Sequence, residues 1–272
     1  MVNRYISSLI FVAAAIEALF GIAFILRLDF ALDMWPMDGT TRLSFLFLAS
    51  MFIAGATSQL WCLWRGERAL FIGVGLNYMT IATPIGIYLV AVGASRGDSD
   101  LLTLGCVFLV SALFGAGIFL WSRGSSVRSP QPAPAIALLA FVVFVLALIV
   151  AGGAMTFHLI DVMPWPLTGD NEVVYGLMFL GASAYFAYSL LRPSWQNSAG
   201  QLAGFLAYDL VLIWPFIRHF SNVPDTLRLN LILYTAVVAI SGLLAVYFLF
   251  VDPRTRAWRP GARVGAPVST GA

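Results

Sequence analysis

The sequence predicts an all-α integral membrane protein with about eight transmembrane helices, arranged as two tandem, parallel four-helix repeats. Of its 272 residues, 60% are hydrophobic and 10% are charged, whereas about a quarter of the residues in a soluble domain are charged. Several apolar runs reach the length that crosses the hydrocarbon core of a bilayer. In addition, a motif and a loop sequence from the first half recur in the second half at nearly the same shift.

The apolar runs define the organisation of the chain. We place the eight spans at residues 5–26, 43–64, 69–92, 101–121, 134–157, 173–191, 199–220 and 229–251. The predicted units are a first repeat (1–121), a cytoplasmic linker containing Gly and Pro (122–133), a second repeat (134–251) and an Arg-rich cytoplasmic tail (252–272) that we expect to be disordered.

The repeat is predicted from two recurring patterns. The spacing Gly-x3-polar-x6-Pro-x3-polar occurs twice, 131 residues apart, first as Gly73, Asn77, Pro84 and Tyr88 and then as Gly204, Tyr208, Pro215 and His219. The sequence WPMDG at residues 35–39 recurs as WPLTG at residues 165–169, a shift of 130. We therefore expect the third and seventh helices to be equivalent and to face each other, and we interpret Trp35 and Trp165 as aromatic anchors at headgroup depth.

The arginines predict the orientation in the membrane. All 15 basic residues are arginines; ten of them fall at the N-terminus, in the even-numbered connectors and in the tail, and five fall on the other side. The positive-inside rule then places both termini in the cytoplasm of a multi-pass inner-membrane protein. No basic patch is interleaved with aromatic residues, so a nucleic-acid partner is not expected.

Two carboxylic acids lie inside predicted spans, and we take both as candidate catalytic residues. Asp209 is near the middle of the seventh span and Glu17 is just past the middle of the first. A carboxylate at this depth costs about 2.5–3.5 kcal/mol on insertion scales, and such groups are usually functional. Because a low dielectric disfavours charge, either acid could carry a proton. The structural alternative is that they only form hydrogen bonds between helices.

Further polar residues on the third and seventh spans are candidates for substrate binding. With the two acids, they could form a polar cluster at the middle of the membrane. These residues are Asn77, Tyr78, Tyr88, Gln201, Tyr208 and His219. A metal site at the outer ends, from His158, Asp161 and His219, is disfavoured because their spacing resembles no ligand pattern and Arg218 is adjacent. No nucleotide-binding, haem or other cofactor motif is present in the sequence, and no cofactor or metal is expected.

Three classes of function remain open at this point. The first, which we favour, is a carrier or binding protein for a small cationic or lipophilic solute, with possible linkage to protons. The second is a membrane enzyme, an isomerase or cyclase, that performs acid–base chemistry on a lipophilic substrate in a pocket lined by aromatic residues. The third is a non-catalytic membrane subunit. The lipid bilayer is the expected partner, and the sequence identifies neither the small-molecule ligand nor the oligomeric state.

Overall fold

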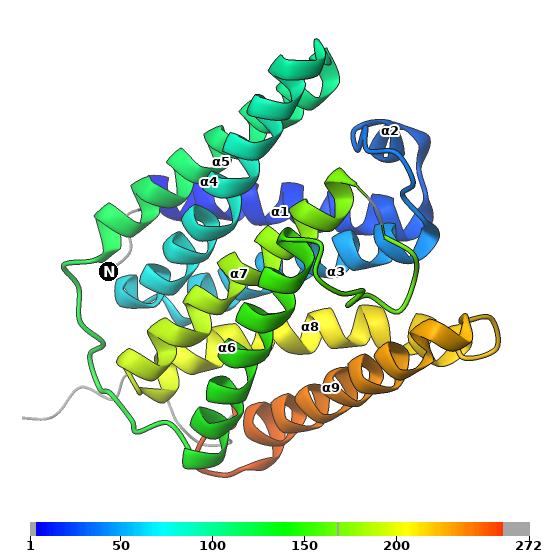
Figure 1. Ribbon diagram of the computed structural model, residues 1–272. Helices are drawn as coiled ribbons and strands as arrows, with labels where there is room; N and C mark the ends of the chain where they lie inside the picture. The colour runs from blue at the N-terminus through cyan, green and yellow to red at the C-terminus, as the bar shows by residue number, and fades with distance from the viewer. Residues whose placement is uncertain (1–3, 168, 258–272) are drawn as a thin grey trace, which may run out of the picture.

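The computed structural model describes residues 4–167 and 169–257, and within these residues the chain is helical (Figure 1). The helices are α1 (Arg4–Leu26), α2 (Asp29–Asp33), α3 (Arg42–Arg65), α4 (Phe71–Arg96), α5 (Ser99–Ser122), α6 (Ala135–Thr156), α7 (Asp170–Leu191), α8 (Trp195–His219) and α9 (Arg228–Val246). Short helical turns at Arg68–Leu70, Asp225–Leu227 and Tyr247–Val251 extend α4 and α9.

Eight helical stretches in the described part of the chain are long and apolar enough to cross a membrane, which confirms the predicted all-α class and number of spans. The predicted ends agree with those of the helices to within five residues. The largest difference at a helix start is in α8, which begins at Trp195 and not at residue 199. The reason is a cap: the hydroxyl of Ser194 accepts a hydrogen bond from the backbone N–H of Asn197, and such caps start a helix before its apolar stretch begins.

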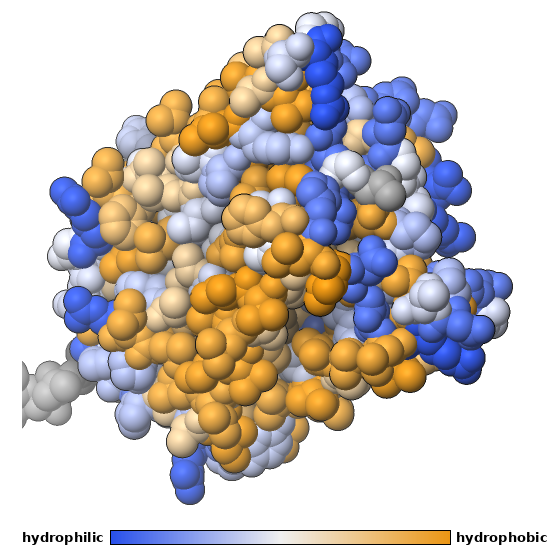
Figure 2. All heavy atoms as spheres, viewed as in Figure 1, coloured by the Kyte–Doolittle hydropathy of each residue, from blue (hydrophilic) through white to orange (hydrophobic). Residues whose placement is uncertain are grey.

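The surface seen in Figure 2 has the distribution expected of a protein in a bilayer. Hydrophobic residues cover the middle of this face, over α5, α6 and α9. Hydrophilic residues gather at the end that holds the α4–α5 turn, α2 and the α8–α9 turn, and a smaller number lie at the opposite end. The chain is therefore a multi-pass membrane protein in its architecture.

The helices pack as four sequential pairs joined by two crossings. The pairs are α1 with α3, α4 with α5, α6 with α7, and α8 with α9 (Figure 1). The first half of the chain contacts the second through α3 on α8 and through α4 on α7. Each half thus contributes its second and third spans to the centre of the molecule, and its first and fourth spans lie at the periphery.

Glycines permit the close approach of helices at both crossings. A Cβ atom added to Gly204 of α8 would lie 2.2 Å from the hydroxyl oxygen of Ser58 and 2.8 Å from the backbone oxygen of Ala54, both on α3. A Cβ added to Gly73 of α4 would lie 2.1 Å from the ring of Tyr185 on α7. Small residues at such contacts are the usual way in which membrane helices gain packing energy, because lipid gives them no hydrophobic reason to associate.

The two Trp-Pro loops each reach into the opposite half of the chain. The indole N–H of Trp35 donates to the side-chain oxygen of Asn171 at the start of α7, over 2.9 Å. The indole N–H of Trp165 donates to the hydroxyl of Ser44 at the start of α3, over 3.0 Å. Both tryptophans are buried. Their indoles therefore join the two halves and do not form an exposed belt, and their position at headgroup depth stays a prediction.

The linker and the start of the tail are held by hydrogen bonds. In the linker, the N–H of Ala133 donates to the oxygen of Pro193, and the N–H of Trp195 donates to the oxygen of Gln131. In the tail, the buried hydroxyl of Thr255 donates to the backbone oxygen of Phe248. The expectation of a disordered tail is thus wrong for residues 252–257, and its remainder, 258–272, lies outside the described residues.

We expect Gly204→Ala to destabilise the protein by about 1–3 kcal/mol, the usual cost of overpacking. The added methyl group meets the backbone of α3 and the Ser58 hydroxyl, so the two helices must separate. Gly117→Ala is the matched control, because a Cβ at Gly117 meets no atom within 4 Å. Thermal unfolding in detergent measures both variants, and equal unfolding temperatures would show that the crossing tolerates a wider separation.

Candidate functional site

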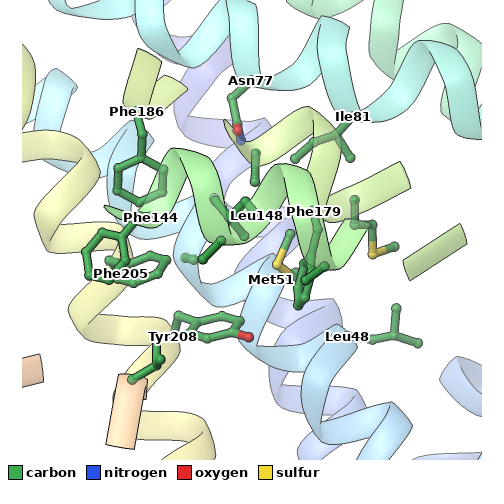
Figure 3. Close-up of a pocket in the computed structure, with 18 of the residues that line it drawn as sticks. Leu48, Met51, Asn77, Ile81, Phe144, Leu148, Phe179, Phe186, Phe205 and Tyr208 are labelled. Carbon is green, nitrogen blue, oxygen red and sulfur yellow. The ribbon is translucent and has the colours of Figure 1, made fainter. Parts of the chain in front are cut away.

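A cavity of about 520 Å³ lies between the two halves of the chain. Residues from all eight membrane-crossing helices line it, and most of them are apolar. Figure 3 shows side chains that converge on it, including Leu48 and Met51 from α3, Ile81 from α4 and Phe179 from α7. A volume of this size and a lining of this kind are typical of sites for small organic ligands, which occupy about 300–1,000 Å³.

Aromatic rings form one side of the cavity (Figure 3). The ring of Phe144 on α6 lies 5.5 Å from that of Phe186 on α7 and 5.0 Å from that of Phe205 on α8, measured between centroids. Tyr208 stacks on Phe205 at 5.6 Å, with 10° between the ring planes. These rings offer a ligand a large apolar surface, and their faces also attract cations.

Glu17 of α1 forms a hydrogen-bonded group with two neighbouring helices. The hydroxyl of Tyr78 on α4 donates to one carboxyl oxygen of Glu17. The side-chain nitrogen of Gln59 on α3 donates to the other over 2.6 Å and lies 2.9 Å from the Tyr78 hydroxyl. Gly55 leaves room for this carboxyl group, since a Cβ there would lie 2.7 Å from it. Both oxygens of Glu17 are therefore satisfied within the protein.

The surroundings of Asp209 on α8 differ from those of Glu17. Its side chain is buried and lines the cavity, and neither carboxyl oxygen has a hydrogen-bond partner among the described residues. The hydroxyl of Ser241 on α9 lies next to it, but this hydroxyl donates its hydrogen to the backbone oxygen of Val237 over 2.7 Å. Buried polar groups in proteins are nearly always paired. Among the described residues, Asp209 is thus an exception to this rule whose carboxyl group faces a cavity.

Two tyrosines stand beside this carboxyl group. The hydroxyl of Tyr208, which precedes Asp209 on α8, bonds the hydroxyl of Tyr234 on α9. Both tyrosines line the cavity. One member of a hydroxyl pair donates the hydrogen bond, so the other keeps a hydrogen that it can offer to another group. Together with Asp209 they place an acceptor and a donor side by side on the α8–α9 wall.

The structure brings six of the eight predicted site residues to the cavity wall: Glu17, Asn77, Tyr78, Gln201, Tyr208 and Asp209. They do not form one hydrogen-bonded cluster, because Glu17 bonds Tyr78 and Asp209 bonds none of the other five. Tyr88 and His219 do not line the cavity. The hydroxyl of Tyr88 donates to Asp170 over 2.8 Å, and Nε2 of His219 lies 3.0 Å from the backbone oxygen of Pro164.

Two residues that hydrogen-bond predicted site residues, Gln59 and Tyr234, were not predicted from the sequence. Gln59 is fully buried inside α3, and a polar amide within a span was a usable signal. Tyr234 gave no comparable signal, because a tyrosine near the outer end of a span is most simply an interfacial aromatic residue. Its role follows only from the pairing of α8 with α9.

The described residues contain no group of three or more His, Cys, Asp or Glu side chains that could hold a metal ion. The residues considered for a metal at the outer ends of the helices do not come together in one group. Nδ1 of His158 pairs with Glu172 at 2.6 Å, and the backbone oxygen of Asp161 accepts a hydrogen bond from Asn230 at 2.7 Å.

No protein-family model matches the chain, and no curated protein and no solved structure is significantly similar to it. The cavity and the acids that line it, Glu17, Asp161 and Asp209, are therefore the features that bear on function.

We expect Glu17→Leu to destabilise the protein and Asp209→Leu to leave its stability unchanged or higher. The first substitution removes the acceptor of Tyr78 and Gln59, and a buried donor without a partner costs about 1–3 kcal/mol. The second breaks no hydrogen bond among the described residues, and it replaces the two carboxyl oxygens in the mostly apolar cavity wall by two methyl groups. Thermal unfolding of both variants beside the wild type makes the comparison. Equal destabilisation by the two substitutions would mean that Asp209 also serves packing.

Proposed function

We propose that this protein binds, and carries across the membrane, a small molecule with an apolar body and one cationic or hydrogen-bond-donating group. The single observation that supports this most is the Asp209 carboxyl group, which is buried, unpaired and part of the wall of a cavity of about 520 Å³. Asp209 binds the polar group of the ligand, and the apolar walls hold its body.

Energetics favour a ligand over a purely structural role for Asp209. A carboxyl group at the middle of a span is costly, and a buried polar group that forms no hydrogen bond costs about 1–3 kcal/mol more. Glu17 recovers part of such a cost through Tyr78 and Gln59. Asp209 has no equivalent partner among the described residues, so a ligand that donates to it, or carries a positive charge, recovers the cost on binding.

The same group links binding to protons. A carboxylate in an apolar cavity needs a counter-charge, which either a proton or the cationic group of the ligand supplies. The two compete for one site, so a bound cation displaces the proton. This competition is the simplest form of coupling between a solute and a proton in a carrier.

The internal repeat remains part of this proposal, and three observations support it. A shift of 131 residues relates α3 to α7 and α4 to α8, so the crossing of α3 on α8 corresponds to the crossing of α7 on α4. The motif glycines follow the same rule, because Gly204 meets Ala54 and Gly73 meets Tyr185, and Ala54 and Tyr185 are also 131 residues apart. The cavity is lined by six pairs at this shift: Glu17 and Leu148, Leu48 and Phe179, Met51 and Ala182, Gly55 and Phe186, Asn77 and Tyr208, Tyr78 and Asp209.

A two-fold arrangement of parallel halves places the site on the axis between them, where carriers built from parallel repeats bind their substrates. We further propose that the protein resides in the cell inner membrane with both termini in the cytoplasm. The excess of arginines on that face, ten against five, supports this orientation.

A second candidate function is supported by the aromatic wall. Phe144, Phe186, Phe205 and Tyr208 surround space next to a carboxyl group, an arrangement that also suits an isomerase or cyclase in which Asp209 protonates an alkene and the rings stabilise the resulting carbocation. Such an enzyme would release a ligand chemically different from the one it binds, whereas a carrier releases it unchanged.

We expect 4-phenylbutylamine to raise the unfolding temperature of the purified wild type, and 4-phenylbutan-1-ol to raise it less. The two probes share an apolar body and differ in the cationic group that Asp209 would bind. Asp209→Asn should remove the difference between the probes while it keeps the shape of the side chain. Thermal unfolding over a series of probe concentrations provides the measurement.

Leu146→Ala serves as the control for this experiment, because Leu146 is exposed on α6 and does not line the cavity. This variant should respond to both probes as the wild type does. If Asp209→Asn keeps the full preference for the amine, the carboxyl group does not bind the ligand, and a non-catalytic, structural subunit becomes the better description.

We expect single cysteines at Ser99 and Ser126 to react with a membrane-impermeant maleimide from opposite sides of the membrane. Both residues are exposed, the first after the α4–α5 turn and the second in the linker. Ser194 is less suitable because it is buried and caps α8. The background is Cys62→Ala with Cys106→Ala, since both native cysteines are free. Labelling from the same side would refute the proposed topology.

A further inference from the structure

Between α6 and α9, the wall of the cavity is formed by two peripheral helices. Each of these two helices packs on a single main neighbour, α6 on α7 and α9 on α8. Figure 1 shows that the start of α6 and the end of α9 lie close together and that the two helices diverge from there. Residues of both helices line the cavity along this stretch, so the space between α6 and α9 is part of the cavity.

One contact lies at each end of this stretch. At the end where the helices meet, buried side chains of α6, α8, α9 and the turn after α9 form one hydrophobic cluster, which includes Phe141, Phe144, Ala245 and Phe248. At the other end, the side-chain nitrogen of Asn230 on α9 donates to the backbone oxygen of Asp161, in the loop after α6, over 2.7 Å. Between the cluster and this bond lies an opening, which we call the window.

The residues that line the window are also exposed on the lipid-facing surface. Val150 of α6 is 68% exposed, and Leu233 and Val237 of α9 are 57% and 40% exposed, yet all three belong to the cavity wall. A residue with both properties marks a place where a cavity reaches the surface. At this place the surface is apolar and lies along two spans, so it faces hydrocarbon and not water.

We infer that the ligand enters from the bilayer through the window between α6 and α9, and that it is therefore a membrane-dissolved amphiphile with a single cationic or hydroxyl group. This inference rests on the proposed function, since it names the route and the class of ligand for the same site. Asp209 on α8, beside Ser241 and Gly242 of α9, lies on the window side of the cavity. The polar group of the ligand reaches it, and the apolar body lies between α6 and α9.

The chemistry of the window favours this route over one from water. Within the window, Val150, Leu233 and Val237 offer a polar solute no hydrogen bond to replace its hydration. A hydrocarbon chain or ring that is already dissolved in lipid loses nothing at the same surface. The exposed Asp161, in the loop after α6, also lines the cavity but lies at the end of the window. The cavity is also too small for a phospholipid with two acyl chains, so a molecule with one chain or a compact ring system fits best.

The experiment uses the full chain in proteoliposomes and a dodecylamine that carries a dansyl group at the end of its chain. Energy transfer from the tryptophans to the dansyl group reports uptake after rapid mixing. The signal of Asp209→Asn is subtracted as background from probe that is dissolved in lipid. Val150→Phe combined with Val237→Phe narrows the window. Val143→Phe combined with Val246→Phe is the matched control, because these valines are exposed on the same helices and do not line the cavity.

Entry from lipid predicts that the window variant takes up the probe more slowly than the wild type, by about tenfold or more, and that the control variant keeps the wild-type rate. Equal rates for the window variant and the control would overturn the inference and point to a route from water. Absence of any Asp209-dependent signal in the wild type would instead overturn the proposed function. Thermal unfolding of both double variants verifies that each is folded.

Discussion

Close backbone contact at two helix crossings is the constraint on which the rest of the structure depends. Lipid provides no hydrophobic force between helices, so the two halves must be joined by contact between small residues and by hydrogen bonds. Gly204 against Ala54 and Gly181 against the backbone of Ile81 supply the first. Ser58 and Thr80 add hydrogen bonds to the backbone oxygens of Gly200 and Gly181, each across one crossing. Because these contacts draw the central helices together, the space left between them and the peripheral helices becomes the cavity.

The fold could be predicted from the sequence to the extent that single helices determine it. Apolar length fixed the eight spans, because each must cross the same hydrocarbon thickness. Apolar length did not predict which helices pack against each other. The hydrogen bonds of Trp35 and Trp165 to the opposite half depend on which loops meet at the outer surface. Composition alone suggested an exposed aromatic belt, and the structure places both indoles in the interior.

Several polar residues of the cavity wall could be predicted from the sequence, but their hydrogen-bond partners could not. Polar residues inside spans must avoid lipid, and this requirement alone brought Asp209, Glu17 and four neighbours to one cavity wall. Depth along a helix does not reveal partners, however. Glu17 is satisfied by Gln59 and Tyr78 from two different helices, whereas Asp209 faces the space beside α9. The distinction between an acid that stabilises the fold and one that is free to bind appears only when the helices are assembled.

The continuous chain has a consequence for the symmetry of the site. The linker between the halves is fixed by hydrogen bonds from Ala133 and Trp195, so both halves belong to one molecule and each side chain of the cavity occurs once. In a homodimer with a two-fold axis, every group at the axis would occur twice. Two identical acids would then face each other, both paired or both unpaired. In a single polypeptide this rule does not apply: Glu17 is hydrogen-bonded within the protein, and Asp209 has no hydrogen-bond partner among the described residues.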